Sequence, residues 1–427
     1  MRRAGWRGAA GRWGRGRAGL IVVALALVLG GAPWAGAAPV ADRVTIGFML
    51  PLTGFAAAEG NGVKDGADLA ARLINEAGGI RVGGRAVRVE LVYEDDRCSP
   101  AGAAEAANRL VSRRVDFVGG SFCSSAALAA QPIYAQASIP QVVYAYATDL
   151  TGAARAKANA RYSVRIGPQA KIEMAPMAKY AVVANNHRTF FAMAQNTDFG
   201  RSMVTEFQAV LEKLGGRFVA PPEYFPAGAS DFRTVLTRAK GSGAQAVLAI
   251  GLLGEMIGIT LQYRELGLTQ AFYGSDLLEN APYMEAVGGR NEGFYSPWFY
   301  DDGVDARRFR RAEPERESKI MALALIKAYG RRGTRDNGWG WGTVNLVKQG
   351  IEKAGTTSNA GVIQKILSGE TFELPFGTYG FTTCGQADMR AGVAMYEGGT
   401  KKVLVTDRDY ASVPPVVLTK TDLCPAR

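Results

Sequence analysis

The sequence predicts an α/β protein made of two doubly wound lobes, each built on a parallel sheet. Short apolar segments alternate with amphipathic segments of roughly 10–15 residues, which is typical of parallel strands joined by helices. The alternation runs through the first part of the chain and starts again near residue 169. With 427 residues, 48% hydrophobic and 21% charged, the chain is globular in composition and long enough for two cores.

The first run of alternating elements begins near residue 43. In its first helix, Val63, Ala67 and Ile74 follow the spacing of one helix face, and Gly78-Gly79 ends the helix. We predict strands at 43–49, 86–94, 115–120 and 141–147, and helices at 62–77, 101–113 and 124–137.

The second run follows a polar, glycine-containing stretch near 148–168, which is the one sign of a boundary between the lobes. Right-handed crossovers place the carboxyl ends of parallel strands at one edge of each sheet, where small ligands bind. We predict helices at 169–184, 201–214, 231–243, 255–267 and 343–354, and strands at 189–194, 216–225, 244–251 and 270–276.

Residues 1–37 have the three parts of a secretory signal peptide. The first 17 residues contain six arginines and no acid, residues 18–29 are apolar, and Ala35-Gly36-Ala37 is a small-residue cleavage pattern. The alternative, a membrane anchor, would need about 20 apolar residues to span a bilayer. We therefore predict cleavage near Ala37 and a soluble mature protein outside the cytoplasm.

The formal net charge of +11 does not indicate a nucleic-acid-binding surface. Six of the 50 basic residues lie in the predicted leader, which leaves 44 basic and 39 acidic residues, or a net charge of +5, for the remainder. The single histidine, His187, excludes His-rich metal sites and makes any Ser-His-Asp triad depend on one residue. Because it follows Asn185-Asn186, we interpret His187 as a surface turn residue.

The four cysteines fit an oxidising compartment, because an even number of cysteines in an exported chain indicates disulfides. Three pairings are possible, and local pairing is the simplest: Cys98 with Cys123, 25 positions apart, and Cys384 with Cys424, 40 positions apart. A zinc site formed by all four cysteines is the competing interpretation, but no C-x2-C pair is present.

The first candidate ligand-binding segment is residues 119–125, between a predicted strand and a predicted helix. The amino end of a helix presents unpaired N–H groups that bind carboxylates, and Ser124 and Ser125 add hydroxyl donors. The structural alternative is that one of these serines only caps the helix.

Two further candidates follow strands. Backbone amides near Ala145, the Tyr146 ring and the Thr148 hydroxyl could close the other side of a carboxylate, although Tyr144 and Tyr146 fall on the same face of a strand. Asp276 follows a strand of the second lobe and could pair with a ligand ammonium group, or serve as a helix N-cap.

Two segments carry weaker signals. Trp339 and Trp341 lie among glycines and could form an apolar wall of the pocket or belong to the core under the helix at 343–354. Residues 60–66 look like a dinucleotide fingerprint, but their third glycine comes one position too late, so we predict no nucleotide cofactor.

Four motifs now point to a family. They are Leu50-Pro51-Leu52-Thr53-Gly54, Ile74-Asn75-Glu76-Ala77-Gly78-Gly79-Ile80, Asp95-Asp96-Arg97-Cys98-Ser99-Pro100 and Gly120-Ser121-Phe122-Cys123-Ser124-Ser125. Over roughly residues 43–400 the chain resembles the periplasmic branched-chain amino-acid-binding proteins, the substrate-binding components of ABC importers with the type I periplasmic-binding fold. The Asp-Asp-x-Cys-x-Pro and Cys-Ser-Ser motifs resemble the family's disulfide and carboxylate-binding loop.

The resemblance implies two lobes that are joined by hinge strands and close on a ligand. It implies lobes at 43–166 plus 297–390 and at 167–296 plus 391–427. The resemblance implies that Ser124 binds the ligand carboxylate and that Asp276 binds its ammonium group. The loop from Ala145 to Thr148, in which Tyr146 replaces a small hydroxyl residue, and Phe199 before Gly200 are also implied to contact the ligand. Trp339 is implied as a further contact, although it lies several positions away from the corresponding family aromatic residue.

The chain departs from the family pattern at several positions. Glu59 replaces a tyrosine of the first lobe, Leu252 replaces an aromatic residue of the second lobe, and Asp276 is shorter than the usual glutamate. The pair Cys384 and Cys424 lies outside the basic family pattern. These changes leave the scaffold but alter the expected ligand, and relatives of this kind also carry amides, urea and aromatic acids.

From the resemblance we expect a monomeric periplasmic protein, not an enzyme, that needs no cofactor or metal and binds no nucleic acid. It should deliver an amino acid or a related aliphatic or aromatic carboxylate to an ABC permease in the inner membrane. One alternative is an extracytoplasmic sensor module of the same fold. A second is a secreted hydrolase, which would need a base near Ser124, whereas His187 falls in the other predicted lobe.

Overall fold

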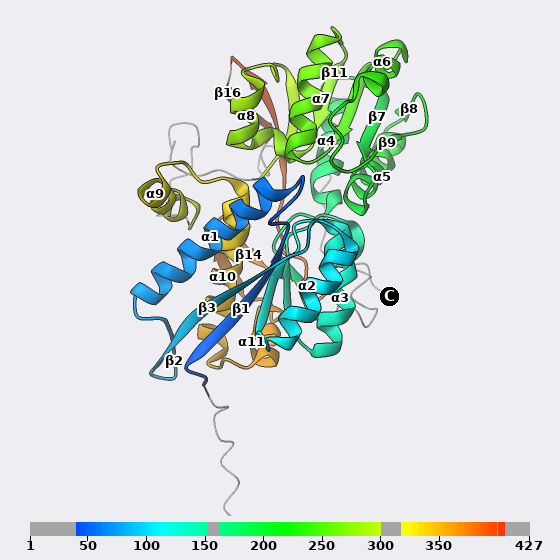
Figure 1. Cartoon of the computed structure of the whole chain (residues 1–427). Helices are drawn as coiled ribbons and strands as arrows, with labels where there is room; N and C mark the ends of the chain where they lie inside the picture. The colour runs from blue at the N-terminus through cyan, green and yellow to red at the C-terminus, as the bar shows by residue number, and fades with distance from the viewer. Residues whose placement is uncertain (1–39, 152–161, 300–316, 399, 406–427) are drawn as a thin grey trace, which may run out of the picture. The chain divides into compact units, whose positions relative to one another are not determined.

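The computed structural model describes residues 40–151, 162–299, 317–398 and 400–405 (Figure 1). These residues belong to one compact unit, Ala38–Arg427, and form two large sheets, a hairpin and the helices packed on them. The predicted leader at 1–37 and Cys424 lie outside the described residues, as does half of the predicted boundary stretch.

The first sheet has the strand order β2-β3-β1-β4-β5-β6, and every pairing in it is parallel except that of β2 with β3. The direction in which strands are added reverses at β1, because β3 lies on one side of it and β4 on the other. The strands are β1 (Arg43–Leu50), β2 (Ile80–Val82), β3 (Arg85–Asp95), β4 (Phe117–Gly120), β5 (Gln141–Val143) and β6 (Ser163–Arg165).

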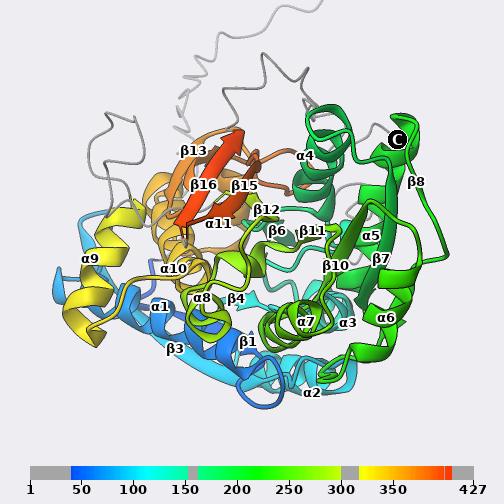
Figure 2. The same cartoon turned by 90° about the horizontal axis from the view of Figure 1, so that it is seen from above.

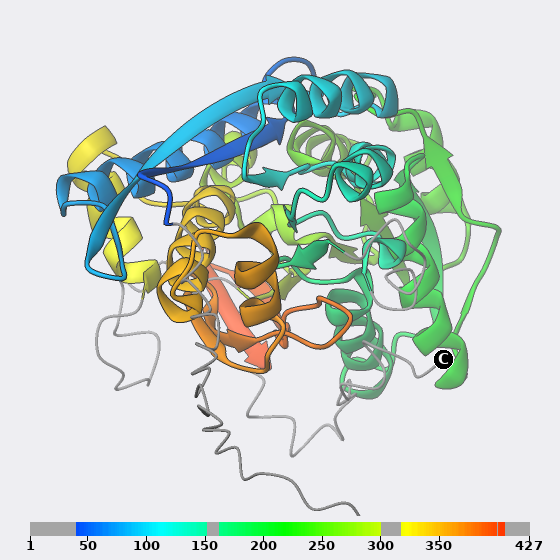
Figure 3. The same cartoon turned by 90° about the horizontal axis from the view of Figure 1, so that it is seen from below.

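Helix α1 runs along α10 at very short range (Figures 1 and 3). A Cβ on Gly340 would lie 1.9 Å from the carbonyl oxygen of Val63, and one on Gly66 would lie 2.0 Å from that of Asn337, so both positions require glycine. The elements packed around the first sheet are α1 (Ala57–Glu76), α2 (Pro100–Ser112), α3 (Ser124–Ala137), η1 (Thr148–Leu150), α9 (Glu317–Tyr329), α10 (Arg335–Ala354), α11 (Asn359–Ile366) and the hairpin of β13 (Thr371–Leu374) and β14 (Gly377–Gly380).

The second sheet has the order β16-β15-β12-β11-β10-β7-β8, with β9 also paired to β7. Strands β7 to β12 pair in parallel, whereas β15 and β16 form an antiparallel edge. The strands are β7 (Thr189–Gln195), β8 (Arg217–Phe218), β9 (Glu223–Phe225), β10 (Ala246–Ile250), β11 (Ala271–Gly274), β12 (Phe294–Trp298), β15 (Gly392–Glu397) and β16 (Thr400–Val405).

Helices cover both faces of the second sheet (Figure 2). Along β7, Phe190 and Ala192 belong to one core together with residues of α4 and α5, whereas Phe191 and Met193 belong to a second core with residues of α6 and α7. This two-residue period is what a strand buried on both faces requires. The helices are α4 (Ala170–Val183), α5 (Asp198–Lys213), α6 (Arg233–Gly241), α7 (Leu253–Glu265), η4 (Asp276–Glu279) and α8 (Ala281–Val287).

The predicted fold class is confirmed, because the chain forms two α/β lobes. The first lobe contains the first sheet and the second lobe contains the second sheet, and the lobes are joined where the chain crosses between the sheets. One crossing connects β6 to α4, and another connects β14 to β15. At these crossings Arg165 forms an isolated parallel bridge with Gln386, whose side-chain amide donates to the carbonyl oxygen of Gly167 at 3.0 Å.

Four predicted elements differ clearly from those observed. The helix predicted at 62–77 begins five residues earlier, at Ala57. The strand predicted at 141–147 ends at Val143, and the segment from residue 144 onward is a loop. The strand predicted at 216–225 is divided into β8 and β9, because Pro221-Pro222 lie between them and proline cannot donate to a strand ladder. The helix predicted at 343–354 begins at Arg335, since the glycines at its start serve helix packing and do not end the helix.

Candidate functional site

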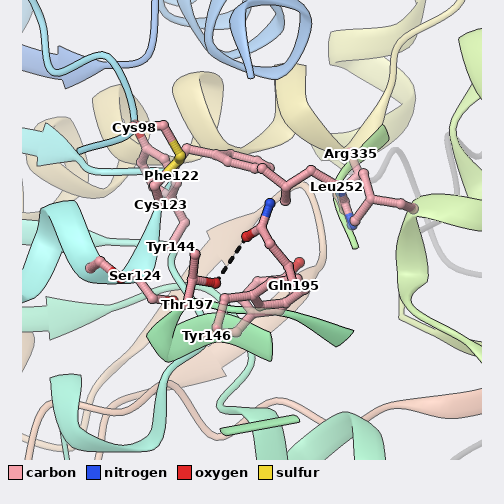
Figure 4. A pocket seen from close by; sticks show the side chains of 13 residues that line it. Cys98, Phe122, Cys123, Ser124, Tyr144, Tyr146, Gln195, Thr197, Leu252 and Arg335 are labelled. Carbon is pink, nitrogen blue, oxygen red and sulfur yellow. Dashed lines mark hydrogen bonds between the residues drawn. A yellow bond between two sulfur atoms is a disulfide. The ribbon is translucent and has the colours of Figure 1, made fainter. Parts of the chain in front are cut away.

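A pocket lies where the carboxyl ends of strands from both sheets meet (Figure 4). It measures about 470 Å³, including its solvent-open part. Most of its lining residues lie at or after the carboxyl ends of β3, β4 and β5 in the first sheet or of β7, β10 and β11 in the second. Strand order reverses at β1, between β3 and β4, and at β7, so the pocket includes both reversal points. The lining residues are Cys98, Phe122, Cys123, Ser124, Ser125, Tyr144, Tyr146, Gln195, Thr197, Phe199, Leu252, Leu277 and Arg335.

A disulfide between Cys98 and Cys123 joins the loop after β3 to the loop after β4. Behind it, the buried Asp96 carboxylate accepts hydrogen bonds from the Cys98 amide at 2.8 Å and from the Ser121 hydroxyl at 2.6 Å. Burial raises the pKa of Asp96 to about 6. The predicted local pairing is confirmed for these cysteines, whereas the pairing of Cys384 with Cys424 stays a prediction, because Cys424 is outside the described residues.

The amino end of α3 forms one wall of the pocket. No side chain caps this end, so the first-turn amides of Ser124, Ser125 and Ala126 lack a capping partner in the described structure. The buried Ser124 hydroxyl accepts a hydrogen bond from the Ala147 amide at 3.1 Å and keeps its own proton for another acceptor. The arrangement suits an anionic group placed at the helix end.

Arg165 fixes the loop that follows β5. Its guanidinium is fully buried and donates to the carbonyl oxygens of Ala145 at 3.2 Å and Ala147 at 2.8 Å. It also donates to the hydroxyl of Thr151 at 3.0 Å. Burial lowers the pKa of Arg165 to about 9, which still leaves it charged at neutral pH. These bonds hold the carbonyl groups of the loop toward Arg165. The Tyr146 side chain of the same loop lies in the pocket lining.

The second lobe contributes the start of α5 and the end of β7. Thr197 is the N-cap of α5, and its hydroxyl donates to the Gln195 side-chain oxygen at 2.9 Å (Figure 4). The Phe199 ring meets the Tyr146 ring edge-on, with centroids 6.0 Å apart. The Ser125 hydroxyl donates to Asp198 at 2.6 Å, which links the two lobes at the pocket rim.

Arg335, at the start of α10, forms a buried ion pair with Asp276 of the second lobe. Its Nε also donates to Oδ1 of Asp336 at 3.1 Å. Burial alone would lower the pKa of Arg335, but the nearby Tyr146, Asp336 and Glu173 outweigh burial and raise the pKa, so this residue is a permanent cation. The Tyr146 hydroxyl donates to the same Asp276 oxygen at 2.6 Å.

Four of the sequence-predicted residues line the pocket together: Ser124, Ser125, Tyr146 and Phe199. The other four do not. Ala145 lends its carbonyl to Arg165, the Thr148 hydroxyl donates to Glu206 at 3.0 Å, and Asp276 is paired with Arg335. The fully buried Trp339 ring stacks on Tyr144, with centroids 6.2 Å apart, and so supports the pocket wall from the core.

Sequence reasoning did not select several lining residues. Gln195 is the last residue of β7, and Thr197 and Leu277 come shortly after β7 and β11, so the rule that ligands bind at strand carboxyl ends would have found them. Arg335 lay before the predicted start of its helix. The signal that could have placed it is Thr334-Arg335-Asp336-Asn337, since Thr334 and Asn337 form a reciprocal capping box at the true start of α10.

Two of the departures from the family pattern, Glu59 and Leu252, meet at one point. Glu59 is 1% exposed, and its Oε1 accepts a hydrogen bond from the amide of Leu253 at 3.0 Å. The carboxylate of Glu59 therefore sits at the amino end of α7, next to Leu252 in the pocket lining. Burial, and then the charge of Asp336, raise the pKa of Glu59 to about 7.

The described residues that line the pocket include no histidine and no carboxylate. His187 is half-buried and lies just before β7, with its Nδ1 2.8 Å from the Tyr273 hydroxyl, at the opposite end of that strand from Gln195. Within the described residues, no cluster of three potential metal ligands occurs.

The comparison with protein families decides the class. Residues 43–402 match the family model described as periplasmic binding protein. The chain belongs to this family. Its matched region contains both sheets and every pocket residue. Among the described residues, no helix combines the length and the apolar character that crossing a membrane demands.

Individual relatives agree with this assignment. The Leu/Ile/Val-binding protein homolog 3 of Brucella melitensis is 29% identical over 80% of this chain and 88% of that protein. A leucine-binding protein from Thermotoga maritima superposes with a TM-score of 0.73 at 23% identity, covering 85% of this chain and 98% of its own. A solute-binding protein from R. palustris in complex with benzoate superposes with a TM-score of 0.73 at 20% identity, covering 86% of this chain and 98% of its own. The two structures show the shared fold.

Proposed function

We propose that this chain is the substrate-binding component of an ABC importer and captures a small carboxylate between its two lobes. The observation that carries the proposal is the position of the pocket, whose lining residues come from the carboxyl ends of strands in both sheets. A ligand in this pocket contacts both lobes at once, and therefore favours the closed arrangement over the open one.

The ligand carboxylate is proposed to bind at the amino end of α3. Ser124 supplies a hydroxyl proton, and the first-turn amides of α3 supply N–H donors. The rings of Tyr146 and Phe199 supply an apolar wall for the rest of the ligand. The Brucella relative is named for leucine, isoleucine and valine and the R. palustris structure holds benzoate, and all of these compounds have a carboxylate.

The biological setting forms part of the proposal. Export by the leader at 1–37 would place the protein in the periplasm. There it is proposed to act as a monomer whose partner is a permease of the inner membrane, and not a nucleic acid. The lobes are proposed to comprise 43–166 plus 297–390 and 167–296 plus 391–427. Support comes from the strands, since β1 to β6 form one sheet and β7 to β12, β15 and β16 form the other.

The test is calorimetry on protein recovered from the periplasm of an expressing bacterium. Mass spectrometry should find a chain that begins near Ala38, and at least one aliphatic or aromatic carboxylate should bind with one-to-one stoichiometry. A folded protein that binds none of the α-amino acids, aromatic acids or aliphatic acids in the panel would contradict the proposal. Thermal shift is the parallel measurement, because a ligand at about 100 times its Kd adds about 2.7 kcal/mol of stability.

A further inference from the structure

The charged side chain in the pocket lining is a cation. Of the pocket's 13 lining residues in the described structure, Arg335 is the sole charged side chain, and the others are aromatic, aliphatic, small polar or disulfide-bonded. Figure 4 shows Arg335 on the opposite side of this group of side chains from Ser124. A ligand whose carboxylate lies at α3 therefore has its other end near a guanidinium.

The Arg335 guanidinium is fixed on two edges and has donor capacity left. Nη1 pairs with Asp276 and Nε donates to Asp336, so rotation of the group is blocked. Nη2 is buried and has no hydrogen-bond partner among the described residues. A buried N–H group without a partner costs free energy, and a ligand acceptor would remove that cost.

Asp276 lies behind the pocket lining. Its Oδ2 accepts from both Tyr146 and Arg335, its Oδ1 is buried and has no hydrogen-bond partner among the described residues, and the residue is not part of the pocket lining. Because Arg335 lines the pocket and Asp276 does not, a ligand ammonium group would meet the Arg335 guanidinium before it reached this carboxylate. The two positive charges would repel each other.

We infer that the ligand of this protein has a hydrogen-bond acceptor, and not an ammonium group, at the end that faces Arg335. The inference rests on the proposed function and narrows it. The substrate class is a small carboxylic acid with a second acceptor group, such as a hydroxy acid, an oxo acid or a dicarboxylic acid. The rings of Phe122, Tyr144, Tyr146 and Phe199 favour an aromatic or extended apolar body between the two polar ends.

The experiment is a calorimetric panel on the periplasmic protein. Three probes have a second acceptor: 4-hydroxybenzoate, terephthalate and adipate. Benzoate lacks a second acceptor. Leucine and phenylalanine have an ammonium group. At least one probe with a second acceptor should bind about tenfold or more tightly than benzoate, and both amino acids should bind more weakly than benzoate.

Variants show whether Arg335 causes the preference. Arg335→Lys keeps the charge beside Asp276 but has no Nη2, and Arg335→Gln combined with Asp276→Asn removes both charges together. Each should lower the affinity of the best second-acceptor probe relative to that of benzoate by about tenfold or more, because a general loss of the contact between the lobes weakens both probes alike. Arg233→Lys, at an exposed arginine paired with Glu265, is the control and should change the affinity of neither probe.

The outcomes separate this inference from the function on which it rests. Tighter binding of leucine or phenylalanine than of every second-acceptor probe would overturn the inference and leave the binding function in place. The same holds if folded Arg335→Lys binds all probes as the parent does. Absence of binding by every acid in the panel would overturn both.

Discussion

The Tyr146 hydroxyl donates a 2.6 Å hydrogen bond to Oδ2 of Asp276 and so connects the loop after β5 to the end of β11. The two residues belong to different sheets, 130 positions apart in the chain. The bond therefore joins the two lobes in addition to its part in local packing.

We predict that Tyr146→Phe destabilises the closed arrangement. Phenylalanine keeps the ring that meets Phe199 but cannot donate to Asp276, and a hydrogen bond to a charged group contributes about 1.5–3 kcal/mol. The free energy of unfolding from urea titration should fall by about 2 kcal/mol, and ligand Kd should rise.

Tyr283→Phe is the matched control for this prediction. The Tyr283 hydroxyl bonds to that of Thr260 at 2.8 Å, and both residues lie in the second lobe. This variant should lose stability without a change in Kd. Equal Kd changes in the two variants would show that the bond to Asp276 has no special part in closure.

The Ser124 hydroxyl has two roles, since it accepts from the Ala147 amide and is proposed to donate to the ligand. Ser124→Ala should raise the ligand Kd by about tenfold and lower stability by about 1 kcal/mol. Calorimetry and urea titration measure the two effects. Ser99→Ala removes a similar hydroxyl from the start of α2, away from the pocket lining, and should change only stability; an unchanged Kd in Ser124→Ala would exclude the proposed contact.

Loss of the disulfide should affect both stability and binding. Cys98 and Cys123 enclose a loop of about 25 residues, for which the loop-entropy model gives about 3–4 kcal/mol. The double variant Cys98→Ser and Cys123→Ser should lose about that much in urea titration. It should also bind ligand more weakly, because both cysteines line the pocket. A double variant with parental Kd would show that the disulfide only stabilises the fold.

Glu59 should make stability depend on pH. Its pKa is raised from 4.5 to about 7 by burial and then by Asp336, so between these values the native state keeps a proton that the unfolded chain has released. The contribution of Glu59 to stability therefore falls as pH rises from about 4.5 to about 7. Relative to the parent, Glu59→Gln should be equally stable near pH 4 and more stable by about 3 kcal/mol near pH 8.

Urea titration at several pH values measures this difference. The titration of Asp96 is common to both proteins and cancels in the comparison. Glu76→Gln, at an exposed glutamate in the last turn of α1, is the control and should follow the parent at every pH. A difference between Glu59→Gln and the parent that does not change with pH would contradict the prediction.

The sequence was sufficient for the fold because the signals of strands and helices are local. The helix predicted at 124–137 coincides with α3, and β1 and β3 differ from their predicted ranges by only one residue at an end. The glycines of α10 were misleading, since they are explained by the nearby backbone of α1, a contact between residues far apart in the chain.

The candidate site was predicted only in part for a related reason. Ser124 was found because it lies in a motif that follows a strand, and a motif is a local pattern, whereas Phe199 was implied by the resemblance to the family. The pairing of Asp276 with Arg335 joins residues 59 positions apart in different packing layers, and no spacing in the sequence indicates it. The charge of the pocket depends on that pairing, so the ligand class required the structure.

The thirteen pocket positions have a consequence for how such a protein diversifies. Most of them lie in the short segments that follow strands, whereas the alternating residues within β7 and β10 fill the cores. Substitutions at the partly buried positions of those segments can therefore redirect the protein to a new nutrient with little repacking of either interior, whereas Leu252 and Leu277 belong to the cores themselves. A library confined to Phe122, Ser125 and Thr197 would sample new specificities while the scaffold stays constant.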